Sequence, residues 1–180
     1  LKRVDLSKAM LAKANLQKAS MFGATLRGAN LRFARLVDAN LEASELTGAD
    51  LTSSNLSGVN LTDAFADRAE FRSAKMINAR LMSANLTRAK MNSTNLSKAN
   101  LSKANLSRAV LTNANFSGAD LSGADLSHSD LSGANLTGSN LNGAKLIGAN
   151  LTKANFTQAN LTGALLSSCL LYTSDAADDS

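Results

Sequence analysis

A large apolar residue occupies every fifth position of this chain, from Leu1 to Leu171, in one unbroken frame. Of these 35 positions, 28 hold Leu, three hold Met and three hold Phe, and the one exception is Ala66. We call them the centres. A step of five residues turns an α-helix by about 500°, and in a strand it sends alternate centres to opposite faces. The pattern therefore predicts a chain that bends once per repeat, so that every centre points inward.

The residue two before each centre, which we call the small position, has the same direction in a locally extended segment. Ala holds 26 of these 34 positions, and Val, Ser, Thr and Cys hold the others. All 11 Gly lie two residues after a centre, at what we call the corner position. Gly accepts the positive φ that several turns require. The chain has no Pro, which suits a backbone whose N–H groups all pair. These features predict a narrow tube lined by large and small residues, with a bend after each centre.

Phrases such as Ala99-Asn100-Leu101-Ser102-Lys103 resemble the A(D/N)LXX unit of the pentapeptide-repeat family, and the resemblance covers nearly the whole chain. It implies an all-β fold, a right-handed quadrilateral β-helix with four repeats per coil. The frame then gives between eight and nine coils, and a rod roughly 40 Å long. We expect one rod domain over residues 1–168. Residues 169–180 are expected to form a non-repeat tail, either disordered or an artefact, because they resemble translated sequencing-adapter read-through.

The formal net charge of +5 is arranged in bands along the chain. Residues 1–35 are mostly basic, residues 36–67 carry six acids and no base, and residues 68–108 carry nine bases against Glu70. Each band wraps the predicted rod as a belt, and no single side collects most of the Lys and Arg. This layout favours a solvated surface over a nucleic-acid groove, which needs a basic stripe on one face. The belt at 68–108 stays open as a site for a partner or for nucleic acid.

Few residues suggest chemistry. His128 is the only His and lies at a corner position, so it cannot form a metal site that needs several convergent ligands. Asp120, Asp125 and Asp130 precede three successive centres, which places them on three different sides, where we interpret them as substitutes for Asn. The one Cys, Cys169, rules out an internal disulfide framework. We therefore predict no catalytic, cofactor-binding or metal-binding residue, no cofactor and no enzymatic activity.

Several irregularities predict local structure. Ala66 is the one small centre, and we expect Phe65 to fill the space beside it, although a dent used for binding is the alternative. Phe22 and Phe33 lie at outward positions near two arginines and could form a contact patch. Asn recurs at every fourth repeat on one side of the predicted rod, where an amide ladder can form; these residues are Asn95, Asn115, Asn135 and Asn155. Stacked Ser and Thr would suit ice binding, but Asn and Ile147 interrupt them.

The sequence therefore favours a non-catalytic scaffold, a rigid rod that binds an unidentified protein through its outer faces. Some members of the resembled family mimic DNA and bind DNA gyrase, giving quinolone resistance, but that role requires an acidic surface. Direct nucleic-acid binding through residues 68–108 is the other alternative. No run of apolar residues suggests a membrane span or signal peptide, so a cytoplasmic location is favoured. Since the chain starts within the repeat frame, we expect a fragment whose open coil ends favour end-to-end or homodimer association.

Overall fold

Each five-residue repeat forms one tight turn in the computed structural model, which describes residues 1–171. In the repeat around Leu101, the Ala104 N–H donates to the Leu101 carbonyl at 3.0 Å and closes the turn. Lys103, inside the turn, has a φ of 58°, as the third residue of a type II turn requires. The Ser102 N–H points away from the neighbouring coils and donates to Asn100 Oδ1 at 2.9 Å. The side chain of the Asn or Asp before a centre thus accepts the hydrogen bond of an N–H group that no backbone carbonyl accepts.

Successive coils pair through the residue before each centre, which we call the bridge position. Asn100 forms a parallel β-bridge with Asp120, which stands four repeats later in the chain. The Leu101 N–H donates to the Asp120 carbonyl at 2.7 Å, and the Asn100 N–H donates to the Ala79 carbonyl of the coil above at 2.9 Å. Every bridge in residues 1–171 has this spacing of four repeats and is isolated, and that part of the chain contains no helix and no longer strand.

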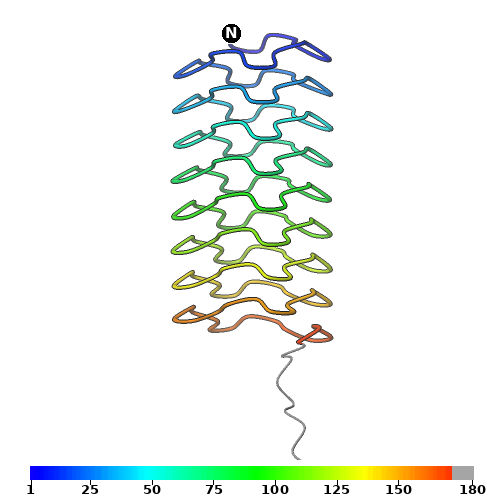
Figure 1. Cartoon of the computed structure of the whole chain (residues 1–180), viewed down its shortest axis with the longest axis vertical. Coiled ribbons are helices and arrows are strands. Elements are labelled where there is room, and N and C mark those ends of the chain that lie inside the picture. The colour runs from blue at the N-terminus through cyan, green and yellow to red at the C-terminus, as the bar shows by residue number, and fades with distance from the viewer. Residues whose placement is uncertain (172–180) are drawn as a thin grey trace, which may run out of the picture.

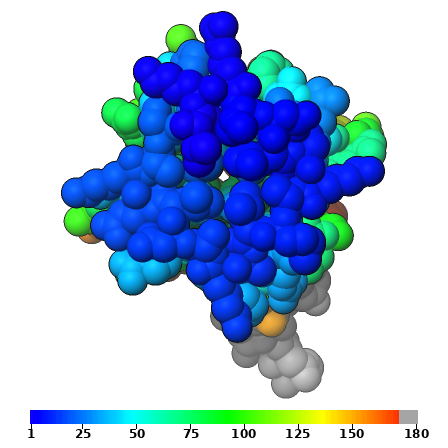
Figure 2. Space-filling view, turned by 90° about the horizontal axis from the view of Figure 1, so that it is seen from above, coloured from blue at the N-terminus to red at the C-terminus, as the bar shows by residue number. Residues whose placement is uncertain are grey.

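The bridges form four columns, each of which defines one face of an all-β solenoid (Figure 1). Face 1 carries the bridge positions 5, 25, 45 and onward to 165, and face 2 carries 10 to 170. Face 3 carries 15 to 155, and face 4 carries 20 to 160. We give each corner the number of the face that precedes it in the chain. Seen from the N-terminal end, side chains project outward on all sides of the rod (Figure 2).

The core is a column of centres and small positions, as the sequence predicts. All centres from Met21 to Leu151 are buried, with at most 3% of each residue exposed. The small positions between them, from Ala24 to Ala149, are buried as well. Most of the Ser and Thr hydroxyls at small positions donate to backbone carbonyls, as Ser54 does to Leu51 at 2.6 Å, whereas the buried Ser44 hydroxyl has no partner. The predicted inward pair of a large and a small residue is therefore confirmed.

The prediction for Ala66 is wrong in one respect. Phe65 does not fill the space beside Ala66, because its side chain points outward on face 1 and is 54% exposed. Ala66 is nevertheless buried, with 1% exposed. The next centre in the same coil is Phe71, which is fully buried and larger than the usual Leu. Ala66 and Phe71 both belong to the buried core, so a larger centre follows the small one along the chain. Bridge positions point outward throughout the rod, and Phe65 follows that rule.

The corners have positive φ whatever residue occupies them. All 11 Gly do, and so do 23 other residues, among them Ala43 with a φ of 53°. The predicted bend at Gly is confirmed, but Gly is not required by φ alone. At Gly58 the absence of a side chain also leaves room for the Asp38 carboxylate of the coil above, because a Cβ there would lie 2.2 Å from Asp38 Oδ1 and the carboxylate would have to move. Gly133 similarly leaves room for Asn113, whose Oδ1 would lie 2.3 Å from an added Cβ.

Candidate functional site

The outer surface is where a functional site must be sought. The packed column of centres fills the interior, and no ligand-sized cavity or cleft opens anywhere in residues 1–171. Among these residues no three His, Cys, Asp or Glu side chains gather as a metal site would require. The part of the chain described here also contains no helix long and apolar enough to cross a membrane. The candidates are therefore the individual side chains that the faces and corners present.

The three aspartates lie apart, each in a turn of its own. Asp120 is on face 4, Asp125 on face 1 and Asp130 on face 2. Each Oδ1 accepts the N–H of the residue after the next centre, at 2.9 to 3.0 Å. Asp120 and Asp130 also accept the side-chain amides of the Asn residues one coil below, both at 3.1 Å. Their interpretation as substitutes for Asn is confirmed, and paired-carboxylate chemistry has no geometry here.

His128 lies exposed at corner 1, in the coil above Gly148. A Cβ on Gly148 would lie 2.7 Å from His128 Nδ1, so the imidazole rests against the backbone of the next coil. Cys169 stands at a small position and packs against the core, where its Sγ–H donates to the Leu146 carbonyl at 2.8 Å. Burial raises the pKa of the Cys169 thiol above its ordinary value. Both side chains have a structural explanation.

The amide ladder exists in part. Asn115 Nδ2 contacts Asn95 Oδ1 at 3.4 Å, and Asn135 Nδ2 contacts Asn115 Oδ1 at the same distance. The hydroxyl of Thr137, on the same face, donates to Asn135 Oδ1 at 2.6 Å. The hydroxyl of Thr157 donates to Asn155 Oδ1 at 2.6 Å in the same way. These hydroxyls donate hydrogen bonds within their own repeats, so on this face they stabilise the turns.

The two N-terminal aromatic residues do not form a patch. Phe22 follows a centre on face 4, whereas Phe33 lies at corner 2, about half a coil further along the chain. Phe33 is 51% exposed, and the Arg32 guanidinium carbon lies 5.6 Å from the centre of its ring. Arg32 is also paired with Asp50 at 3.1 Å. The contact patch expected from sequence is not assembled, because Phe22 and Phe33 lie on different sides of the rod.

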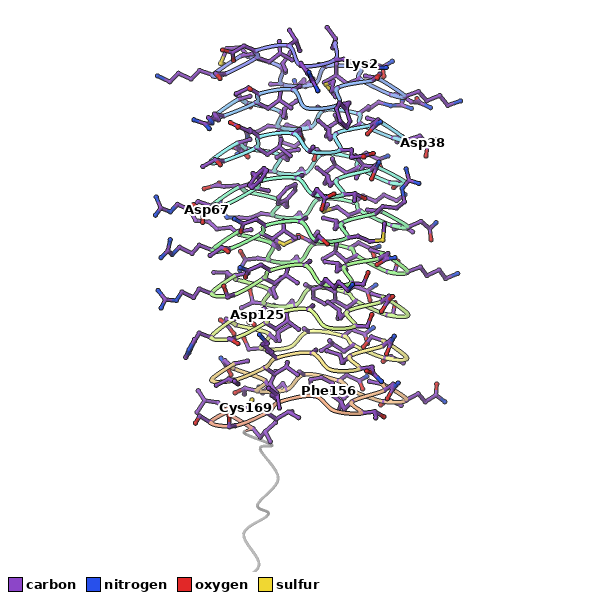
Figure 3. The ribbon with its side chains drawn as sticks, turned by 180° about the vertical axis from the view of Figure 1, so that it is seen from behind. Lys2, Asp38, Asp67, Asp125, Phe156 and Cys169 are labelled. Atoms are coloured by element: carbon purple, nitrogen blue, oxygen red, sulfur yellow. The ribbon has the colours of Figure 1, made fainter. Side chains whose placement is uncertain are left out.

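The basic belt contains a cluster of arginines at one corner, which is not found when the basic residues are counted on each side of the rod. Arg68, Arg88 and Arg108 all stand at corner 1, in three successive coils. Long side chains with nitrogen tips run down the edge of the rod that carries Asp67 (Figure 3). The signal in the sequence is three Arg spaced by four repeats, each at the same position of its repeat. We call these three residues the arginine column.

The repeat, the four bridge columns and the filled core identify the architecture. A model of pentapeptide repeats matches the chain in 8 copies, over residues 1–28, 26–63, 49–88, 67–102, 89–127 and 129–167. The chain belongs to the pentapeptide-repeat family. Membership confirms the resemblance seen in the sequence and the all-β solenoid. None of the curated proteins is similar enough to count as a match to this pentapeptide-repeat chain.

Solved structures of the family give relatives of differing similarity. The chain is similar to HetL, involved in heterocyst differentiation regulation in the cyanobacterium Nostoc sp. strain PCC 7120, with 32% identity and a TM-score of 0.62. That alignment covers 93% of this chain and 87% of HetL. A trypsin-treated form of QnrB1, a plasmid-mediated fluoroquinolone resistance protein, is 20% identical, with a TM-score of 0.45. That alignment covers 96% of this chain and 89% of the QnrB1 chain.

Proposed function

We propose that this chain is a non-catalytic interaction rod that binds another protein through its outer faces. The observation that carries the proposal is the filled core, since every centre from Met21 to Leu151 is buried and leaves no interior space for a substrate. The rod is proposed to be right-handed, with between eight and nine coils, in accord with bridges that recur after every four repeats. Outward side chains on such a rod stand in fixed columns, which suits recognition of a partner surface without a change of shape.

The separation of the candidate chemical groups supports a non-catalytic role. General acid–base catalysis needs a side chain that is positioned within hydrogen-bond reach of a bound substrate and is free to exchange a proton with it. Asp120, Asp125 and Asp130 stand on three faces, and each already accepts hydrogen bonds within its own turn. His128 rests against the backbone at Gly148 rather than against a carboxylate that could orient it. The surface is therefore better suited to binding than to turnover.

The test is capture of a partner followed by reconstitution. The immobilised rod is incubated with lysate, and retained proteins are identified by mass spectrometry. A purified candidate is then titrated against the rod by calorimetry. The control is a rod of the same repeats in which the residues at all corner positions are exchanged among coils. A saturable complex with the native rod, lost in the control, supports the proposal. Absence of any saturable protein complex contradicts it.

Mimicry of DNA is less well supported than protein binding through ordinary charged faces. A DNA mimic must present a strongly acidic surface, whereas this chain has a formal net charge of +5. Its acidic belt at residues 36–67 is partly neutralised, since Arg27 pairs with Glu45 and Arg32 pairs with Asp50. A gyrase supercoiling assay with the purified rod distinguishes the two functions. We expect no inhibition at micromolar protein, and inhibition would favour mimicry.

A further inference from the structure

The arginine column is a regular array held by the backbone. The corner N–H of Arg68 donates to the Thr87 carbonyl at 2.9 Å, Arg88 to Ser107 at 3.0 Å, and Arg108 to Ser127 at 2.9 Å. The three residues have φ values of 55°, 56° and 60°, so their side chains leave the rod in the same direction. Coils in a β-solenoid are spaced by about 4.8 Å, so the column spans about 10 Å from first to last Cα.

The two lower arginines of the column have no acidic partner among the described residues. Arg68 Nε lies 3.5 Å from its neighbour Asp67. Arg88 and Arg108 form no ion pair within residues 1–171, and both are exposed. Glu70, the acid beside the column on face 2, is shared by Arg72 at 3.0 Å and Lys90 at 2.8 Å. The edge between faces 1 and 2 therefore carries an excess of positive charge that the rod itself does not neutralise.

We propose that the arginine column binds an acidic segment of a protein partner, with carboxylates of that segment pairing with Arg88 and Arg108. This inference rests on the proposed function and names the chemistry of its partner. Guanidinium groups present paired N–H donors that match the two oxygens of a carboxylate, and they remain charged at all physiological pH values. Two or three acidic side chains on one short segment span about the same distance as the column.

The length of the column favours an acidic peptide over nucleic acid. A nucleic-acid strand gains affinity from many phosphate contacts along an extended basic track. Here the track ends on both sides, because the coils above belong to the acidic belt at residues 36–67 and the coils below carry Asp125 and Asp130 on the adjoining faces. A strand longer than a few nucleotides would lie over these acids. A short acidic segment would contact the arginines alone.

A second copy of this chain is a poorer occupant. On the same edge of the rod, the acids in the coils above the column are Glu45 on face 1 and Asp50 on face 2. Glu45 is already paired with Arg27, and Asp50 is already paired with Arg32. To supply these carboxylates to Arg88 and Arg108, a second rod would have to break its own ion pairs. Below the column, Asp125 and Asp130 on the same edge already accept the N–H groups of Ser127 and Ser132 with their Oδ1 atoms. An external acidic segment has no such cost.

The experiment measures binding of a fluorescein-labelled short peptide rich in Glu, by anisotropy at low salt, to the whole chain. The matched peptide has Gln in place of Glu, and labelled oligo-dT is the nucleic-acid probe. The test variant is Arg88→Ala/Arg108→Ala. The control variant is Lys98→Ala/Lys103→Ala, which removes the same charge at corners 3 and 4, between the two arginines in the chain. Circular dichroism verifies that both variants keep the β-helix.

We expect the arginine variant to lose about tenfold or more in affinity for the Glu peptide, since hydrogen bonds between charged groups are the strong ones. The lysine variant should lose about twofold, the share expected from general charge screening. The Gln peptide should not bind. The inference is overturned if the wild type does not bind the Glu peptide, if both variants lose affinity equally, or if oligo-dT binds more tightly than the peptide.

Failure of this inference is distinguishable from failure of the proposed function. If a reconstituted protein partner binds the wild type and the arginine variant equally well, the rod is still an interaction scaffold, and only the assignment to this corner is wrong. If no protein partner forms a saturable complex, the proposed function fails, and the peptide titration still decides whether the arginine column recognises acidic segments.

Discussion

At the scale of single residues, the corner position carries a conformational cost that the rod accepts many times. A non-Gly residue in the left-handed region costs roughly 1–2 kcal/mol relative to the right-handed one. Twenty-three residues other than Gly have positive φ at corners, whereas 11 corners hold Gly. The turn needs this φ so that the small position can bond back to the preceding centre. Replacing a corner residue by Gly should therefore stabilise the rod wherever the side chain that is lost makes no compensating contact.

Ala43 is the clearest of these corners, because a methyl group cannot form a local hydrogen bond. Its φ is 53°, and its N–H donates to the Thr62 carbonyl at 2.9 Å, a bond that Gly would keep. We expect Ala43→Gly to stabilise the rod by about 0.5–1 kcal/mol, the relief of strain less the greater unfolded-state entropy of Gly. Urea denaturation followed by circular dichroism measures the change. Ala39→Gly, at a buried small position, should instead destabilise.

At the scale of the repeat, the residue before each centre completes the hydrogen bonding of the turn. Asn115 shows all of its contacts: its Oδ1 accepts the Ser117 N–H at 3.0 Å and the Asn135 amide at 3.4 Å, while its Nδ2 contacts Asn95 at 3.4 Å. The N–H after a centre has no carbonyl to meet, since the other four N–H groups of the repeat take the carbonyls of the turn and of the neighbouring coils. An Asn or Asp side chain supplies the missing acceptor.

Replacing Asn115 with Ala tests this role. We expect Asn115→Ala to lower the free energy of unfolding by about 1–2 kcal/mol, because the Ser117 N–H loses its acceptor and the amide ladder is interrupted. The matched substitution is Lys145→Ala at a bridge position on face 1, where an ammonium group cannot accept a hydrogen bond. Equal losses in the two variants, measured by thermal denaturation, would argue that the Asn side chain contributes only through burial.

Ion pairs between coils add a pH-dependent contribution at the same scale. Asp50 accepts the Thr52 N–H at 2.9 Å and pairs with Arg32 Nη1 of the coil above at 3.1 Å. Burial raises the pKa of Asp50, but these hydrogen bonds and the Arg32 charge outweigh burial, so its pKa lies below the ordinary value. The stabilisation by Asp50 is therefore complete above the pKa of the unfolded chain, about 3.9, and is lost as the pH falls through the lower folded value.

Asp50→Asn should reveal that contribution. At pH 7 the variant is expected to be less stable than the wild type by no more than about 1 kcal/mol, because the pair is partly exposed and screened. The difference should shrink as the pH falls below about 3.9, because the carboxylate of the unfolded chain then protonates before that of the folded protein. Urea denaturation at pH 7, 5 and 3 measures it. Asp63→Asn, at an exposed corner without an ion pair in the described part of the chain, should show a smaller difference at every pH.

The sequence predicts most of the rod because each repeat states the direction of its own side chains. Leu101 and Ala104 are buried for the same reason as their counterparts in other coils, and Gly133 marks a bend by its type alone. The direction of Phe65 is harder to predict, because the small centre beside it suggests a void for an aromatic ring to fill, whereas Phe65 points outward and Ala66 is buried. The arginine column is also missed when basic residues are assigned to the sides of the rod, because that assignment compares the sides with one another and does not follow one corner through successive coils.

At the scale of the whole molecule, register is the property that all coils share. Every coil stacks on the next through bridges four repeats apart, and every centre stands one repeat from the last. Removing whole repeats therefore keeps each centre inside the tube, although the faces below the deletion are exchanged. Removing a single residue changes which side chains point inward in the damaged coil. The tolerance of the rod to deletions should depend on whether whole repeats are removed, not simply on the size of the deletion.

We expect deletion of the five residues 131–135 to be tolerated better than deletion of Gly133 alone, although it removes more of the chain. The five-residue deletion should leave a cooperative unfolding transition, because centres still meet centres. A deletion of Gly133 should lower the melting temperature by about 10 °C or more, since each Leu displaced from the core costs roughly 1.5–3 kcal/mol. Deletion of residues 131–150, one full coil, serves as the control that keeps all four faces aligned. Circular dichroism during heating provides the comparison. If loss of one residue were tolerated better than loss of five, stacking would not depend on the frame, and the account of the core as a register of centres would be wrong.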